Sequence, residues 1–296
     1  MKIAVTGGSG KAGRAVVGDL LEHGHEVLNV DLVPSREDAA PFLPADLTDY
    51  GQTLEALSGA EVLPGVEAVV HLAAIPAPDK ATPDIVFRTN ITSTHTVFSA
   101  AWRLGLKRVV WASSETTLGL PFDTPPEFAP VDEEHPLRPE SSYALSKVLG
   151  EEMARQFNRW SGIPIVGLRF SNVMERDDYQ QFPSYWDDPQ IRKWNLWGYV
   201  DESHVGQSCR LGLEADIAGA EAFVIAAGDT VMQRPSRDLM AEVFHGVPVR
   251  DGVDGHDTLL GRCMTVSPAA MTNASAPAMS ASRPSRHDCA TWDSST

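Results

Sequence analysis

The chain has 296 residues, of which 43% are hydrophobic, a normal composition for a globular protein that buries a substantial core. Its formal net charge of −16 argues against nucleic acid or an anionic membrane as a partner, because either would need a basic surface. The widely spaced Cys209, Cys263 and Cys289 offer neither a disulfide framework nor a CxxC metal site. With no apolar leader or long apolar run in view, we expect a cytoplasmic globular protein without a bound metal.

Short apolar runs alternate with longer amphipathic stretches from the first residues onward. Extended segments are predicted at 3–6, 26–30, 67–72, 108–112 and 163–170, and helices at 14–23, 52–57, 83–104 and 142–160. Most of the extended runs are apolar on both faces, as are strands of a parallel sheet covered by helices. The alternation predicts an α/β fold with a Rossmann-type, doubly wound parallel sheet.

A glycine-rich turn separates the first predicted strand from the first predicted helix. It reads TGGSGKAG and has the G-x-x-G-x-x-G spacing, formed by Gly7, Gly10 and Gly13. Gly7 suits a tight turn, Gly10 lets backbone amides approach a pyrophosphate, and Gly13 lets the helix pack close to the sheet. Because Lys11 is followed by Ala12 and not by Ser or Thr, the pattern favours a dinucleotide over a nucleotide triphosphate.

An acidic residue ends the second predicted strand. Asp31 follows the glycine turn at the distance where dinucleotide-binding folds place a carboxylate on the adenosine ribose. Such a carboxylate accepts hydrogen bonds from the ribose hydroxyls and repels a 2′-phosphate. We therefore predict NAD as the cofactor, although the nearby Arg36 would suit NADP.

A tyrosine and a lysine lie four residues apart in the predicted helix 142–160. Tyr143 and Lys147 belong to the sequence YALSK, capped by Ser141 or Ser142, so both side chains emerge on one face. A phenol has a pKa of about 10, and a nearby ammonium favours the phenolate. We predict Tyr143 as the acid/base and Lys147 as the group that lowers its pKa; the alternative is an ordinary helical pair with a solvated lysine.

Two serines follow the predicted strand 108–112. Ser113 and Ser114 would lie at the carboxyl edge of the sheet, where open α/β folds place their ligands. A hydroxyl there can hold the substrate oxygen during hydride transfer. We assign this role to Ser114, with Ser113 in reserve.

Together these motifs resemble the extended short-chain dehydrogenase/reductase family, also called the NAD-dependent epimerase/dehydratases. The likeness extends to DLTD at 46–49, HLAA at 71–74, Asn90, ASS at 112–114 and RFSNV at 169–173. It implies adenine contacts from Asp46 and Leu47, a nicotinamide-ribose bond from Lys147, and a homodimer through the helices holding Asn90 and Tyr143. The expected cofactor-binding residues are Gly7, Gly10, Lys11, Ala12, Gly13, Asp31, Asp46, Leu47, Leu72, Ala73, Ala74, Asn90, Ala112, Ser113, Tyr143, Lys147, Phe170, Asn172 and Val173.

The pattern changes after residue 172. We expect residues 1–172 to form the NAD-binding domain with the catalytic helix, and residues 173–264 to form a small substrate-side region interleaved with the last strands. Residues 265–296 are rich in Ser, Ala, Thr and Pro without an apolar period, so we expect a disordered tail.

The short stretch between RFSNV and Asp201 bears on the substrate. Nucleotide-sugar members of the family usually carry a longer insert there, so the chain looks more like the uronate dehydrogenase branch, which acts on free sugar acids. We expect Ser114, Asn172 and Arg169 to contact the substrate, with Arg176, Arg192 and Lys193 as further candidate cations. Aromatic residues in the same stretch suit either sugar stacking or core packing: Tyr179, Phe182, Tyr185, Trp186, Trp194, Trp197 and Tyr199.

Three hypotheses follow for function. The first is an NAD-dependent oxidoreductase that transfers hydride from a hydroxyl of a small sugar or sugar acid, through Ser114, Tyr143 and Lys147. The second is an epimerase or dehydratase of a nucleotide sugar that uses the same residues. The third, an NAD-sensing regulator without catalysis, is disfavoured because the Tyr/Lys pair is intact.

Overall fold

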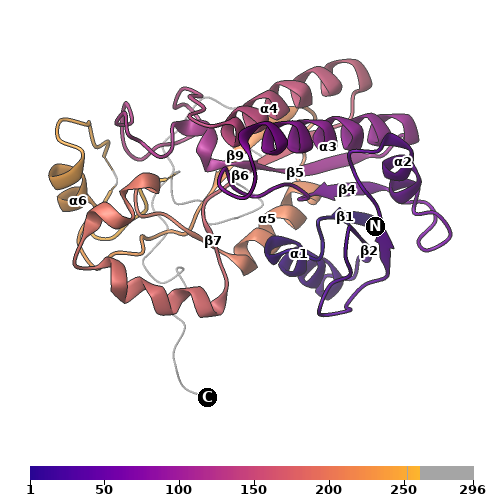
Figure 1. Cartoon of the computed structure of the whole chain (residues 1–296), viewed down its shortest axis with the longest axis horizontal. Coiled ribbons are helices and arrows are strands. Elements are labelled where there is room, and N and C mark those ends of the chain that lie inside the picture. Colours follow the sequence, from indigo (N-terminus) through magenta and orange to yellow (C-terminus); the bar gives the residue numbers. More distant parts are fainter. Residues whose placement is uncertain (252, 261–296) are drawn as a thin grey trace.

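A computed structural model describes residues 1–251 and 253–260 (Figure 1). Seven strands form one sheet in the order β3-β2-β1-β4-β5-β6-β9, and every neighbouring pair is parallel. The strands are β1 (Lys2–Thr6), β2 (Glu26–Asp31), β3 (Phe42–Pro44), β4 (Ala68–His71), β5 (Arg108–Ser114), β6 (Ile165–Phe170) and β9 (Ala220–Ile225). The chain winds outward in one direction from β1 and in the other from β4, which confirms the doubly wound Rossmann-type sheet.

Helices cover both faces of this sheet. They are α1 (Lys11–Glu22), α2 (Tyr50–Ser58), α3 (Pro83–Leu104), α4 (Ser142–Ser161) and α5 (Glu202–Glu214). A sixth helix, α6 (Ser236–Val243), lies away from the sheet. In Figure 1, α3 and α4 lie along one face and α1 and α5 along the other. None of the helices in the described part of the chain combines the length and apolar character needed to cross a membrane.

The alternation of side chains along the strands divides the interior into two layers. Ile3 and Val5 of β1 pack with Leu20 of α1 in one cluster, whereas Ala4 between them packs with Phe98 of α3 in the other. Successive strand residues point to opposite faces, so a strand that is apolar throughout supplies both layers. This is why the predicted strands read as continuous apolar runs.

A third apolar cluster is formed mainly by residues that follow β5 and β6 in the chain. Met174 of a two-stranded parallel sheet, β7 (Val173–Met174) with β8 (Val200–Asp201), belongs to it. The same part of the chain forms the short helices η1 (Glu115–Leu118), η2 (Arg176–Tyr185), η3 (Pro189–Ile191) and η4 (Lys193–Asn195). The centre of the cluster holds Trp197, which is fully buried and donates its indole N–H to the Pro189 carbonyl at 2.8 Å. Most of the aromatic residues considered for sugar stacking pack in or against this cluster: Tyr179, Phe182, Tyr185, Trp194, Trp197 and Tyr199.

The third cluster also contains residues that precede position 172, the predicted end of the NAD-binding domain. Leu118, Phe122 and Val131 belong to it, so the substrate-side part of the molecule combines the segment after β5 with the segment after β6. The predicted tail at 265–296 lies outside the described residues.

Candidate active site

A cavity of about 1080 Å³ lies across the carboxyl edge of the sheet. The ends of five strands contribute to its wall through Gly7 after β1, Asp31 of β2, Leu72 after β4, Ser114 of β5 and Phe170 of β6. This is the switch point at which the strand order reverses, where doubly wound folds bind their ligands. Its volume lies just above the roughly 300–1,000 Å³ of typical small-molecule sites, which leaves room for a dinucleotide together with a small substrate.

The glycine turn packs too tightly to accept side chains at two positions. Gly7 has a φ of +73°, and a Cβ there would lie 2.6 Å from the Ala73 nitrogen. A Cβ on Gly13 would lie 2.0 Å from the Gly7 carbonyl oxygen. Gly10 is the N-cap of α1 and has no side chain that could accept a hydrogen bond from the helix. The first backbone N–H groups of α1 have no acceptor within the helix, and the residues that carry them line the cavity. This cradle fits the pyrophosphate of a dinucleotide.

The end of the cavity where adenosine is predicted to bind carries an oriented carboxylate. Asp31 accepts hydrogen bonds from the backbone N–H of Ser9 at 3.1 Å and of Leu32 at 2.7 Å, which fixes its side chain at the cavity wall. Asp46 and Leu47 line the cavity on the neighbouring loop, where Asp46 accepts from the Thr48 backbone at 2.9 Å. Both carboxylates keep lone pairs that ribose hydroxyls or the adenine amine can use.

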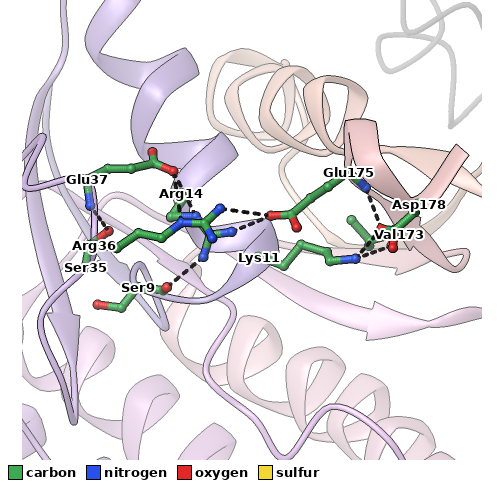
Figure 2. A network of polar contacts seen from close by, with 9 residues as sticks. All are labelled: Ser9, Lys11, Arg14, Ser35, Arg36, Glu37, Val173, Glu175 and Asp178. Atoms are coloured by element: carbon green, nitrogen blue, oxygen red, sulfur yellow. Dashed lines mark hydrogen bonds and ion pairs between the residues drawn. The ribbon is translucent and has the colours of Figure 1, made fainter. Parts of the chain in front are cut away.

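An ionic network joins the glycine turn to the segment after β7 (Figure 2). Lys11 pairs with Asp178 of η2, and Arg14 of α1 pairs with Glu175 and, at 3.0 Å, with Glu37. The pairs with Asp178 and Glu175 join residues separated by more than half the chain, and Lys11 itself lines the cavity. They hold the first turn of α1, which would bind the phosphates, against the substrate-side part of the molecule.

The predicted preference for NAD over NADP can be tested at Asp31. Arg36, the cation that would suit NADP, is largely exposed, lies 3.6 Å from Glu37 and 3.8 Å from Glu175, and does not line the cavity. Replacing Asp31 with alanine should lower the ratio of kcat/KM for NAD over NADP by about tenfold or more, because a charged hydrogen-bond acceptor is lost and a repulsion removed. Asp123→Ala, which changes an exposed carboxylate outside the cavity lining, is the control. Unchanged selectivity in Asp31→Ala would refute the ribose role.

The opposite end of the cavity gathers the predicted acid/base residues. Ser141 caps α4 by accepting from the Ala144 backbone at 3.0 Å, which decides between the two predicted caps. Tyr143 and Lys147 follow on one face of α4 and line the cavity with Ser114. Tyr143 is 8% exposed and Lys147 4%. One helical turn and one strand end thus bring the three groups to the same place.

The electrostatics of the pair differ from the expectation. Burial raises the pKa of Tyr143 to about 12, with a smaller contribution from the charge of Glu115, and hydrogen bonding to Ser114 opposes the rise. Lys147 donates to the Ala112 carbonyl at 2.7 Å, and its Nζ lies 5.7 Å from the centre of the Tyr143 ring. Burial lowers the pKa of Lys147 to about 8. Without a cofactor, desolvation therefore outweighs any stabilisation of the phenolate by the ammonium.

Two of the expected cofactor- and substrate-binding residues do not line the cavity, and neither do the further candidate cations Arg176, Arg192 and Lys193. Arg169 donates to the Glu151 carboxylate at 2.9 and 2.8 Å in a buried pair that Ser113 joins with a 2.6 Å hydrogen bond. Asn90 uses its amide to bind both backbone groups of Ile75, at 2.8 and 3.0 Å. These side chains brace β5, β6 and the loop after β4, and the other expected residues, including Asn172 and Val173, do line the cavity.

Several residues of the cavity lining were not among the predicted site residues, although Ser171 lies within the RFSNV motif. Glu115, Ser171 and Trp194 line the cavity at the end that holds Tyr143, and the loop from 75 to 80 lines another part of its wall. Glu115 stands in the sequence ASSETTLG directly after the serine pair, so its proximity to Ser114 was the only available signal. Arg192 lies behind this end of the cavity, buried, where it donates to the Gly198 carbonyl at 3.0 Å.

Comparison with known proteins agrees with this geometry. The model of the NAD dependent epimerase/dehydratase family matches residues 3–186. The chain belongs to the NAD-dependent epimerase/dehydratase family. It is therefore an NAD-dependent enzyme of the short-chain dehydrogenase/reductase type, as its motifs predict.

Individual relatives include sugar dehydrogenases. The NAD-dependent glucose-6-phosphate dehydrogenase of Haloferax volcanii is 28% identical over 229 residues, which are 72% of this chain and 80% of that protein. The uronate dehydrogenase of Pseudomonas syringae pv. tomato is 24% identical over 263 residues, 83% and 91% of the two chains. Among solved structures, a short-chain dehydrogenase/reductase superfamily protein from Agrobacterium tumefaciens with bound NAD has a TM-score of 0.64 at 26% identity, covering 88% of each chain.

Proposed function

We propose that the chain is an NAD-dependent dehydrogenase that oxidises a hydroxyl of a small sugar. The observation that supports it most is the arrangement of one cavity: the glycine turn and Asp31 lie at one end, and Ser114, Tyr143 and Lys147 at the other. A dinucleotide that spans this cavity would bring its nicotinamide to the three side chains. The sugar dehydrogenases among the relatives, which include an L-arabinose 1-dehydrogenase, support a sugar as the substrate.

Each of the three side chains has a distinct task. The Ser114 hydroxyl accepts hydrogen bonds from the Thr116 backbone at 3.2 Å and hydroxyl at 2.9 Å, so its own proton is left to donate. That proton bonds to Tyr143 without a ligand and would hold the substrate oxygen in the complex. Tyr143 takes the proton of that hydroxyl as general base. Lys147 donates one of its three N–H groups to the Ala112 carbonyl, and the other two can donate to the ribose beside the nicotinamide.

Bound NAD would supply the nicotinamide ring that accepts hydride from the substrate carbon. The glycine turn and the first turn of α1 would hold the pyrophosphate, and Asp31, Asp46 and Leu47 the adenosine. Because the oxidised ring is positively charged, binding it beside Tyr143 would lower the pKa of a phenol that burial has raised. The acid/base group would then be activated only in the complex.

An epimerase or dehydratase of a nucleotide sugar is the second candidate, favoured by the description of the family. In that reaction hydride returns to the same substrate, so the cofactor is not consumed. A screen of aldoses, uronic acids and nucleotide sugars with NAD, followed by the absorbance of NADH, separates the two. We expect NADH to accumulate with a small sugar; interconversion of a nucleotide sugar with no accumulated NADH would contradict the proposal.

We further propose a homodimer formed through α3 and α4. The surface of these helices exposes large apolar side chains, among them Trp102 at 54% and Trp160 at 50%, together with Ile85, Leu145 and Leu149. Such residues gathered on one layer are typical of a subunit interface. The buried free thiol of Cys209 suits the reducing cytoplasm, where we place the protein.

A further inference from the structure

A buried carboxyl group borders the reacting end of the cavity, and the proposed mechanism does not use it. Glu115 is the first residue of η1, directly after Ser114, and is 3% exposed. It lines the cavity, and its Oε2 atom has no hydrogen-bond partner within the described residues. An unpartnered buried acceptor is costly, so its persistence next to a ligand cavity points to a partner that arrives with the ligand.

The surroundings of Glu115 do not neutralise it by an ion pair. The nearby Arg192 guanidinium is held elsewhere: it donates to Gly198 and lies over the rings of Trp194 and Tyr185, 4.9 and 5.3 Å from their centres. No cation of the described residues comes within salt-bridge distance of Glu115, although Arg192 contributes a longer-range attraction. Burial raises the pKa of Glu115 to about 7, and hydrogen bonds from Ser171, Asn195 and the Asn172 backbone, together with the charge of Arg192, oppose the rise.

The charges along the cavity wall then limit what can bind beside Ser114 and Tyr143. Of the lysines in the described lining, Lys11 is paired with Asp178, Lys80 lies 3.8 Å from Asp79 on the loop after β4, and Lys147 is anchored on β5. No arginine belongs to the lining as described. An acidic group on the substrate would find no cation dedicated to it and would face Glu115.

We infer that Glu115 accepts a hydrogen bond from a hydroxyl of a neutral sugar next to the reacting carbon, and that it selects against sugar acids and sugar phosphates. The inference rests on the proposed dehydrogenase function and narrows its substrate class. A second polar group supports it: the Ser171 hydroxyl, which hydrogen-bonds to Glu115 and lowers its pKa, also lines the cavity and is buried. Vicinal hydroxyls of a sugar could donate to the unpartnered Oε2 atom and to the Ser171 oxygen, whereas a carboxylate or phosphate offers the ionised Glu115 only acceptors.

The test is a ratio of specificities in wild type and Glu115→Gln. The ratio is kcat/KM for D-galactose over kcat/KM for D-galacturonate, with NAD saturating and NADH as the readout; D-glucose and glucose 6-phosphate form a second pair. Wild type should prefer the neutral sugar. Glu115→Gln keeps the size of the side chain and removes its charge, so the ratio should fall by about tenfold or more, with weaker use of the neutral sugar and stronger use of the acid.

Glu152→Gln is the matched control, because Glu152 lies on α4 outside the cavity lining and bonds to Arg155 and Gln156 at the surface. Its ratio should equal that of wild type. An unchanged dissociation constant for NAD in Glu115→Gln would show that the variant is folded. A wild type that prefers galacturonate, or a ratio unmoved in Glu115→Gln, overturns the inference and leaves the dehydrogenase proposal standing. A wild type that forms no NADH from any sugar overturns both.

Discussion

Tyr143→Phe should lower kcat/KM for NADH formation by about 10² to 10⁴-fold, the usual contribution of a positioned general base. The substitution removes one oxygen atom from a side chain that is nearly buried at the reacting end of the cavity. The ring stays, so the packing of α4 and the affinity for NAD should be unchanged. Initial rates of NADH formation, with the dissociation constant for NAD from isothermal titration calorimetry, check both parts.

The control for Tyr143→Phe is Tyr50→Phe. Tyr50 is 43% exposed at the start of α2 and does not line the cavity. Its variant should match wild type in rate and in affinity for NAD. A Tyr143→Phe enzyme with full activity would remove the phenol from the mechanism, whereas loss of NAD binding in that variant would point to a structural role.

Gly13→Ala should weaken NAD binding by about tenfold to a hundredfold, the range that corresponds to overpacking a tight site. The added methyl would lie 2.0 Å from the Gly7 carbonyl oxygen and 2.6 Å from the Gly8 Cα. Both are backbone atoms, so the glycine turn must move to accept it. The displaced turn would no longer present the first N–H groups of α1 to the pyrophosphate. The dissociation constant for NAD is the measurement.

Gly18→Ala provides a control within the same helix. A Cβ at Gly18 has no atom within 4 Å, and alanine is the better helix former. This variant should bind NAD as wild type does, with equal or greater stability to heat. If Gly13→Ala bound NAD as tightly as Gly18→Ala, the close approach of α1 to the glycine turn would not be needed for the cofactor.

Much of the fold could be predicted because its strands and first turn carry local signals. The residues of β1, β4 and β5 that pack in the two core layers are all apolar, so these strands read as apolar runs in the sequence. The glycine spacing marks the start of α1. The strand β3 was missed because it has three residues, pairs only with β2 and ends in Pro44, as an edge strand can. Such a strand is defined by its neighbour and not by its own pattern.

Some predicted site residues are likewise positioned by local sequence spacing, and others by partners far away in the chain. Tyr143 and Lys147 depend on the spacing within one helix, so the sequence was sufficient to bring them together. The surroundings of Arg169 and Asn90 depend on Glu151 of α4 and on the loop at Ile75, partners that no local pattern reveals. The pKa of Tyr143 could not be anticipated either, since it follows from burial between separate elements.

The most direct test is a crystal structure of the chain with NAD bound. The adenosine ribose should lie on Asp31, the pyrophosphate on the first turn of α1, and the nicotinamide between Ser114 and the Tyr143–Lys147 pair. A nicotinamide placed away from these three side chains, or a dinucleotide bound in the reverse direction, would contradict the account.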